Sequence, residues 1–190
     1  MTRTFLALEL PDAVRNTLRL YIERLARMIP EVHWADPAGL HTTLAFLGEL
    51  DDERLDAASQ AAATVADVHA PFSLRLAGLG TFGSAHSPRV IWVGLAGEKA
   101  RLLALQAAVA DELAARGFSR EARPFSPHLT LARIKKPLTD NALAALARVQ
   151  REPSPDATWQ ADAISVMKSE LLRPAARYTA VSRWPLALTS

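Results

Sequence analysis

The residues best suited to chemistry occur in a five-residue stretch that the chain contains twice. Residues 41–45 read HTTLA and residues 128–132 read HLTLA, so both follow the pattern H-x-T-L-A. If each stretch is a β-strand, its His and Thr side chains lie on the same face, with Cα atoms roughly 6.6 Å apart. Each strand then offers one imidazole and one hydroxyl to the same space.

A pair of such strands suits proton transfer at a phosphate. Because an imidazole has an unperturbed pKa of about 6.5, one His can accept a proton while the other donates one. Hydroxyls and backbone amides beside them suit phosphate oxygens, on which charge builds in the transition state. A lone His in an apolar strand is more often a packing residue, but two in matched contexts favour catalysis by His41 and His128.

A metal centre does not fit the motif residues. Catalytic or structural zinc needs three or four protein ligands, and neither motif supplies a Cys, Asp or Glu. The other histidines, His33, His69 and His86, stand in contexts unlike the motifs and unlike each other, so we interpret them as surface or packing residues. The motif residues therefore predict no metal site.

The context of the motif repeats as well. An apolar run opens at Phe5, 36 residues before His41, and another opens at Ile91, 37 residues before His128. Both spans read as an apolar strand, an amphipathic helix, a connection and a motif strand. This period indicates an internal duplication and two similar lobes with one motif each.

Hydrophobic periodicity and turn residues place the other elements. We expect an α+β fold in which two mostly antiparallel sheets line a central cleft and helices cover the outer faces. The glycine-rich residues 78–83 read as a turn followed by a loop to Pro88, because no helix opens behind them to make a phosphate cradle. The expected helices span 11–29, 51–69, 100–116 and 139–149, and the expected strands span 4–9, 32–35, 40–47, 72–77, 89–95, 125–132, 164–167 and 178–181.

Composition limits the remaining possibilities. With 190 residues and 49% hydrophobic content, the chain suits one domain over residues 1–190, and the absence of cysteine excludes disulfides. No signal peptide and no membrane-spanning run is recognisable, so we expect a soluble cytoplasmic protein.

Basic residues gather around the second motif although the formal charge is only +2. A basic rim beside a site suggests a phosphate-bearing ligand, whereas the alternative is a solvated loop. Between residues 116 and 136 the single acid is Glu121, and the bases are Arg116, Arg120, Arg123, Arg133, Lys135 and Lys136.

At this point the chain resembles the 2H phosphoesterases, and within them the RNA 2′,3′-cyclic phosphodiesterases, also called 2′-5′ RNA ligases. The two spaced motifs carry the resemblance to the superfamily, and the flanking residues carry the resemblance to the subfamily. The matching residues are FLAL at 5–8, Trp34, HTTLAFLG at 41–48, LGTF at 79–82, RVIW at 89–92, PHLTLAR at 127–133, Ser169, Leu171, Tyr178 and WPL at 184–186.

The resemblance implies the bilobal fold expected above and a reaction without cofactor. Water opens a 2′,3′-cyclic phosphate on an RNA end and leaves a 2′-phosphate, and the reverse reaction is 2′-5′ ligation. His128 would be the proton acceptor and His41 the proton donor, although the near-symmetry of the motifs leaves this order open from the residues alone. Thr43 and Thr130 would bind the phosphate. We also expect RNA ends or cyclic nucleotides as partners, no membrane, and a monomer.

Two further residues enter through the resemblance, Arg133 as a phosphate ligand and Phe46 beside the nucleobase. Each stands five positions beyond its motif His, where strict strand alternation would turn it away from the cleft. Either both lie past the strand end or the strand bulges there. The resemblance implies the first, whereas a position in the core is the alternative for Phe46. The chain departs from the subfamily at Ala175-Ala176, where a glycine is frequent, which affects only the loop conformation there.

Two other functions remain open. A 2H enzyme for small cyclic nucleotides or nucleotide-derived cyclic phosphates would keep the same four motif side chains and differ in the rim. A non-catalytic RNA-binding module would instead need stacking aromatic residues across a sheet. Most of the aromatic residues here fall in patterns typical of a core.

Overall fold

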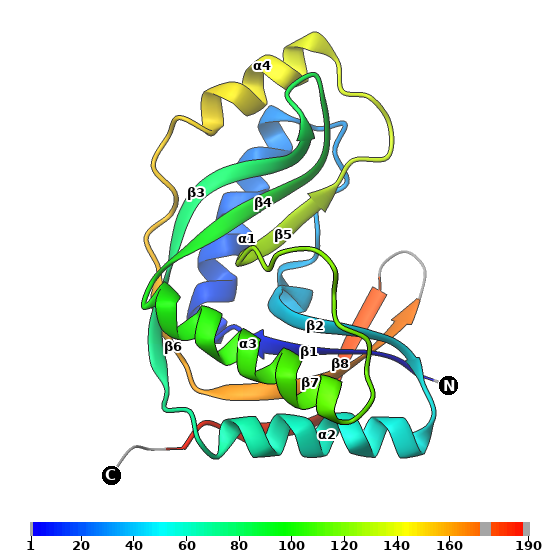
Figure 1. Ribbon diagram of the computed structural model, residues 1–190. Helices are drawn as coiled ribbons and strands as arrows, with labels where there is room; N and C mark the ends of the chain where they lie inside the picture. Colours follow the sequence, from blue (N-terminus) through cyan, green and yellow to red (C-terminus); the bar gives the residue numbers. More distant parts are fainter. Residues whose placement is uncertain (1, 172–175, 188–190) are drawn as a thin grey trace.

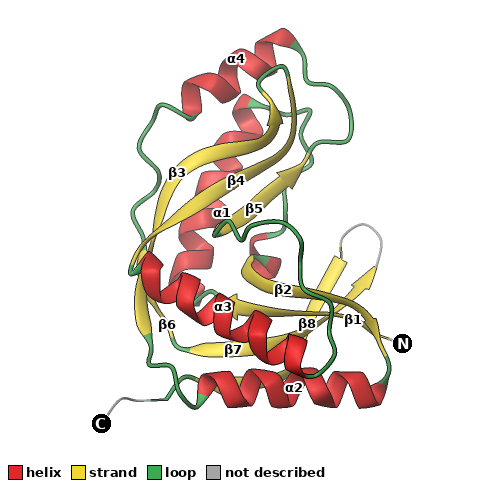
Figure 2. Ribbon diagram, viewed as in Figure 1, coloured by secondary structure: helices red, strands yellow, loops and turns green. Residues whose placement is uncertain are grey.

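The computed structural model describes residues 2–171 and 176–187, which form two antiparallel four-stranded sheets and four α-helices (Figures 1 and 2). The first sheet has the strand order β2-β1-β7-β8, from His41–Leu50, Thr2–Glu9, Ala163–Leu171 and Ala176–Pro185. The second has the order β5-β4-β3-β6, from His128–Arg133, Ser87–Gly97, Phe72–Ser84 and Thr158–Ala161. The α+β class and the antiparallel pairing are therefore confirmed.

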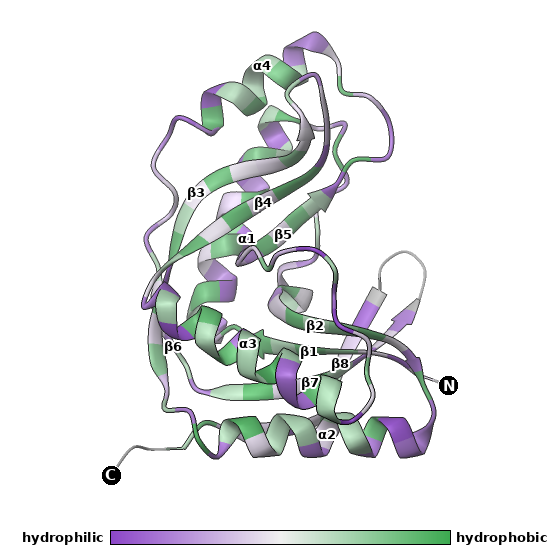
Figure 3. Ribbon diagram, viewed as in Figure 1, coloured by the Kyte–Doolittle hydropathy of each residue, from purple (hydrophilic) through white to green (hydrophobic). Residues whose placement is uncertain are grey.

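The helices are amphipathic, and two of the four begin with the side-chain caps that the sequence predicts, Asp51 and Thr139. The four helices are α1 (Asp12–Met28), α2 (Asp52–Ala66), α3 (Lys99–Ala115) and α4 (Asp140–Val149). The Asp51 carboxylate accepts a hydrogen bond from the Arg54 amide at 2.9 Å, and the Thr139 hydroxyl accepts one from the Ala142 amide at 3.3 Å. Such caps satisfy amides that the first helical turn leaves unpaired. In Figure 3 each helix carries both hydrophilic and hydrophobic residues.

The glycine-rich segment is a strand, and the turn expected at residues 78–83 is wrong. Strand β3 continues to Ser84 and pairs with β4 along most of its length. Gly80 lies opposite Trp92, whose indole ring crosses the glycine so closely that a Cβ there would be 2.2 Å from the ring. The glycine therefore makes room for a neighbouring side chain, a function that glycine also serves inside strands.

Smaller differences concern the ends of elements. Residues 32–35 form no strand, and Trp34 makes an isolated bridge to Ala132 instead. Strand β5 begins at His128, three residues later than expected, and β8 extends well beyond the expected 178–181. Of the Ala175-Ala176 pair, Ala175 lies outside the described residues and Ala176 opens β8.

Each motif strand is the edge strand of its own sheet, and the two edges meet where the lobes join. Strand β2 ends the first sheet and β5 ends the second, and the two strands are in contact (Figure 1). Both sheets bury their other face in one continuous hydrophobic core. This arrangement leaves one face of each sheet, here called its motif face, for the side chains of the H-x-T motif.

Segments of the chain also cross between the lobes. Figure 1 shows α1 running behind the second sheet, although it follows the first strand of the first sheet. The Glu31 carboxylate, just beyond α1, accepts hydrogen bonds from the amide and hydroxyl of Thr139 at 3.1 and 3.0 Å. Arg24 of α1 forms an ion pair with Glu152. None of the helices within residues 2–171 and 176–187 has the length and apolar character needed to cross a lipid bilayer.

Candidate active site

Both motif histidines are held in the same way. Nδ1 of His41 lies 2.8 Å from the carbonyl oxygen of Gly39, and Nδ1 of His128 lies 2.6 Å from that of Ser126. Because a carbonyl only accepts, each Nδ1 carries the hydrogen and donates it. Nε2 is then an acceptor in the neutral ring and a donor in the charged ring. Each imidazole is thus prepared to exchange a proton through Nε2.

A one-residue bulge in β2 brings Phe46 onto the motif face. In the pairing with β1, Thr43 lies opposite Ala7 and Ala45 lies opposite Leu6, so Leu44 is the additional residue. The bulge reverses the alternation beyond Thr43, and Phe46 consequently pairs with Phe5 on the same face as the motif. The two rings lie 6.1 Å apart.

The second motif strand has the same irregularity at the same motif position. Thr130 lies opposite Trp92 and Ala132 lies opposite Ile91, so Leu131 is the additional residue. Arg133 therefore pairs with Val90 on the motif face and is exposed there. The expectation that both fifth residues lie past the strand end is wrong, since Phe46 is inside β2 and Arg133 is the last residue of β5.

Each bulge is stabilised by a donor from a distant part of the chain. The carbonyl of Leu44 accepts a hydrogen bond from the side-chain amide of Gln106 in α3 at 3.3 Å. The carbonyl of Leu131 accepts one from the Ala35 amide at 2.7 Å. Since a bulge leaves backbone groups without ladder partners, these donors stabilise the local geometry.

The ring of His41 is enclosed by aromatic side chains of the first sheet. It stacks on Phe5 with ring centroids 4.6 Å apart and meets Tyr178 edge-on at 5.1 Å. This burial lowers the pKa of His41, and Arg15 lowers it further. The hydrogen bond to Gly39 and the charge of Glu9 act in the opposite direction and raise that pKa.

His128 has a different set of aromatic neighbours. Phe82 meets it edge-on with centroids 4.9 Å apart, and the Trp92 ring lies 6.2 Å away. Phe82 and Trp92 are themselves in contact at 5.4 Å. Strand β3 brings Phe82 to this position because it continues through the glycines at which the sequence predicts a turn.

The motif threonines and the residues before them point to opposite sides. Thr43 and Thr130 are partly exposed on the motif faces, and among the described residues no hydrogen bond engages either hydroxyl. Thr42 and Leu129 face the core, at 1% and 0% exposure. The alternation predicted from the sequence therefore holds up to the bulge.

The basic residues near β5 divide into two groups. Arg116 forms an ion pair with Glu112, and Arg120 forms one with Asp111 at 2.6 Å. Between the residues that the structure describes, no ion pair involves the exposed residues Arg123, Arg133, Lys135 and Lys136. The described part of the chain, residues 2–171 and 176–187, contains no group of three or more His, Cys, Asp or Glu side chains placed to hold a metal ion.

Comparison with known proteins identifies the family. The model of the 2′-5′ RNA ligase superfamily matches residues 10–172. The chain belongs to the 2′-5′ RNA ligase superfamily. As a member of it, the chain is 38% identical over 129 residues to the RNA 2′,3′-cyclic phosphodiesterase of Geobacillus stearothermophilus, covering 68% of this chain and 41% of that protein. It is 33% identical to the Archaeoglobus fulgidus protein of the same name, over 70% of this chain and 73% of that protein.

Solved structures of superfamily members share the whole fold. A Thermus thermophilus protein is 30% identical with a TM-score of 0.77, and the match covers 97% of both chains. Escherichia coli LigT in complex with 3′-AMP is 27% identical with a TM-score of 0.73, covering 97% of this chain and 98% of that one. Both solved structures match this chain along nearly its full length.

Reasoning from the superfamily motif alone misses several residues around the histidines. Glu9, Phe5, Phe82 and Trp92 were not among the expected site residues, although three of them belong to the matching flanks. Their strands approach the histidines only through long-range pairing. Two sequence signals point to this region: the matching flanks that contain Phe5, Phe82 and Trp92, and the matched distance from each apolar run to its motif.

Proposed function

We propose that the protein hydrolyses RNA 2′,3′-cyclic phosphodiester ends to 2′-phosphomonoesters by acid-base catalysis with two histidines and no metal. The observation that carries this proposal is the pair of motif histidines on facing edge strands, each with Nδ1–H bound to a carbonyl. Relatives named RNA 2′,3′-cyclic phosphodiesterase support the substrate class. One chain supplies both histidines, so the proposed site needs no second chain, and the proposal includes a monomer that acts in the cytoplasm.

In this proposal His128 is the proton acceptor and His41 the proton donor. Nε2 of neutral His128 takes a proton from water as the water oxygen attacks phosphorus. The bond from phosphorus to the 3′ oxygen breaks, and that oxygen takes the proton from Nε2 of charged His41. The product keeps the 2′-phosphate, and the two histidines end in exchanged protonation states.

The phosphate oxygens are bound by Thr43, Thr130 and Arg133. Their positions on the two motif faces support this, because the bulge at Leu131 turns the Arg133 guanidinium to the same side as the Thr130 hydroxyl. A guanidinium is always charged and offers several donors in a fixed plane, which suits a phosphate that gains negative charge in the transition state.

Phe46 supports a nucleobase next to the cyclic phosphate. Its side chain is 58% exposed although it lies in the middle of a strand. An exposed ring on the motif face suits a base, because single-stranded RNA is commonly bound by stacking bases on aromatic rings. Tyr178, 38% exposed on the motif face of the same sheet, extends this aromatic surface.

Substrate binding should favour the charged form of His41. Burial lowers the pKa of His41 in the free protein, which favours the neutral ring. A donor must be charged, and the negative phosphate of a bound substrate raises the pKa again. The rate should therefore follow a bell-shaped pH profile whose two limbs belong to the coupled pair.

The deciding experiment compares two substrates under the same conditions. The protein is given either oligonucleotides ending in a 2′,3′-cyclic phosphate or 2′,3′-cyclic mononucleotides as substrate. The 2′- and 3′-phosphate products are then resolved. We expect faster turnover of the oligonucleotide and only 2′-phosphate product. Preference for the mononucleotide would favour a small-molecule phosphodiesterase, and binding without turnover would favour an RNA-binding module.

Ligation is tested in the same assay. An RNA 5′-hydroxyl can take the place of water as the nucleophile; its attack on phosphorus breaks the bond to the 3′ oxygen, which takes the proton from His41, and leaves a 2′-5′ linkage. Adding such an RNA at high concentration should yield a small amount of joined product. Formation of that product should depend on the same two histidines.

A further inference from the structure

The two motif histidines differ in the residue that lies opposite them in the neighbouring strand. His41 pairs with Glu9 of β1, whereas His128 pairs with Gly94 of β4. Directly opposed residues in antiparallel strands have Cβ atoms about 5 Å apart and share one face. A carboxylate therefore lies opposite one imidazole, and a residue without a side chain lies opposite the other.

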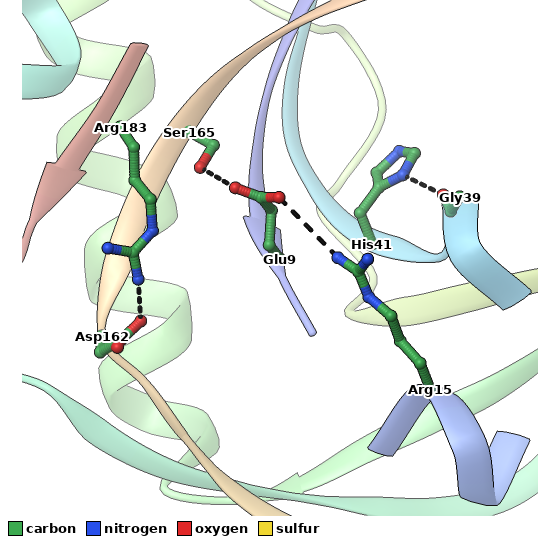
Figure 4. Close-up of polar contacts among 7 residues, drawn as sticks. All are labelled: Glu9, Arg15, Gly39, His41, Asp162, Ser165 and Arg183. Atoms are coloured by element: carbon green, nitrogen blue, oxygen red, sulfur yellow. Dashed lines mark hydrogen bonds and ion pairs between the residues drawn. The ribbon is translucent and has the colours of Figure 1, made fainter. Parts of the chain in front are cut away.

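The Glu9 carboxylate is held from two other elements. The hydroxyl of Ser165 in β7 donates to Oε1 at 2.5 Å, and a guanidinium nitrogen of Arg15 in α1 lies 3.8 Å from Oε2 (Figure 4). Ser165 is only 1% exposed and is one of three buried polar residues among those described. These contacts fix the carboxylate on the motif face next to the imidazole.

Glu9 and His41 also line the same small cavity. It has a volume of about 80 Å³ and includes Arg15 from α1 and Tyr178 from β8 in its wall. Among the described residues, Glu9, Arg15 and Tyr178 are the titratable or charged groups that line this cavity with His41. Arg183 lies on the same face of the sheet but forms an ion pair with Asp162 at 2.9 Å (Figure 4).

We infer that Glu9 is a positioning residue whose negative charge counteracts the loss of proton affinity that burial imposes on His41 and so favours His41 as the proton donor of the pair. The inference rests on the proposed two-histidine mechanism and adds the feature that distinguishes its members. A negative charge close to an imidazole stabilises the charged ring. His128 has no equivalent, because glycine occupies the opposing position.

Arg15 acts against Glu9. Its guanidinium is close enough to pair with Glu9, and its positive charge opposes protonation of His41. Neutralising Glu9 and removing Arg15 should therefore shift the pKa of His41 in opposite directions. Arg15 and Glu9 together join α1 to β1. If that were their only function, both substitutions should disturb the pKa of His41 in the same direction.

The first test measures the titration of His41 directly. The five histidines are followed by the NMR signals of their ring protons, and the His41 signal is assigned by its loss in His41→Ala. Glu9→Gln, which keeps the shape and an acceptor for Ser165, should move the midpoint to lower pH. Arg15→Met should move it to higher pH. Glu23→Gln, which removes an exposed ion pair with Arg19 on the same helix, is the matched control and should move nothing.

The second test uses the pH dependence of turnover. If His41 is the donor, a lower proton affinity reduces its charged fraction, so Glu9→Gln should lose about 3- to 10-fold in rate at alkaline pH and little at acidic pH. Arg15→Met should do the reverse and gain rate at alkaline pH. Glu9→Asp should restore part of the lost rate, because it returns the charge.

The outcomes separate the inference from the proposed function. An unchanged or raised His41 midpoint in Glu9→Gln would overturn the inference, whatever the kinetics show. A lowered midpoint combined with a faster rate at acidic pH would support the effect of Glu9 and make His41 the proton acceptor, which would overturn the proposed donor. A protein that titrates as expected but does not hydrolyse cyclic phosphates would overturn the proposed function alone.

Discussion

The two motif strands have one backbone arrangement and two different surroundings. In each, the His donates from Nδ1 to the carbonyl two residues earlier, and a bulge follows the Thr. Two residues beyond the bulge stands Phe46 in the first strand and Arg133 in the second. The residue opposite the His is Glu9 in the first strand and Gly94 in the second. The repeated backbone positions the reacting groups. The differing side chains assign base binding, phosphate binding and proton transfer to different residues of the two strands.

The largest effect should come from removing either histidine. His41→Ala and His128→Ala should each lower turnover by roughly 10² to 10⁴, the range for a lost general acid or base. The double variant should be little worse than either single one, because the two act as a unit. Rates on a cyclic-phosphate-ended oligonucleotide measure this, with circular dichroism as the folding control. Losses below about tenfold in both folded variants would contradict the mechanism.

Arg133 should have the next largest effect and should leave the pH profile bell-shaped. Arg133→Ala should reduce kcat/KM by about 10- to 100-fold, since a charged hydrogen bond to phosphate contributes about 1.5–3 kcal/mol. Arg133→Lys should also be impaired, because it keeps the charge and loses the planar fork.

Lys135→Ala, which removes an exposed base two residues further on, is the control for general charge. If Arg133→Ala abolished one limb of the profile, Arg133 would belong to the proton chemistry.

Gly80 tests how the surroundings of His128 are built. Gly80→Ala should destabilise the fold by about 1–3 kcal/mol, because the added Cβ would overlap the Trp92 ring. Turnover should fall as well, since Trp92 packs near His128. Gly78→Ala, two residues earlier and with no atom within 4 Å of the added Cβ, is the matched control. Equal midpoints of denaturant unfolding for the two variants would contradict the explanation given for Gly80.

Thr42 should show a smaller effect of the opposite sign. Its hydroxyl is buried and has no hydrogen-bond partner within the described part of the chain, while Leu129 stands at the same place in the second motif. Thr42→Val keeps the shape and removes the unpaired hydroxyl, so it should stabilise the fold by about 1 kcal/mol without changing kcat. Thr43→Val, on the other face of the strand, should instead lower activity. A destabilised Thr42→Val protein would show that the hydroxyl has a function in the core.

The smallest expected effect is that of a chelator. Turnover should be the same with and without EDTA, because the motif residues cannot supply three metal ligands. Loss of activity in EDTA and recovery with a divalent ion would require a different account of both histidines.

Much of this organisation could be predicted from the sequence because it depends on local patterns. The paired H-x-T motifs, the antiparallel α+β class and the helix caps at Asp51 and Thr139 all follow from spacing and residue type. A bulge in each motif strand is one of two alternatives that the sequence leaves open, and its position at Leu44 and Leu131 could not be predicted, since nothing in a leucine distinguishes a bulged position from a regular one. Glu9 was missed for a related reason: its neighbour His41 is known only once the register of β1 and β2 is known.

The donors that hold the two bulges connect the halves of the chain in a reciprocal way. The bulge in the first half accepts from Gln106 in the second, and the bulge in the second half accepts from Ala35 in the first. A fragment ending between the halves, in the loop at residues 67–71, would lack the donor for its own bulge. The repeated motifs indicate a duplication, yet neither half now contains everything that shapes its motif. Cutting the chain there should yield two inactive fragments that regain activity only on mixing.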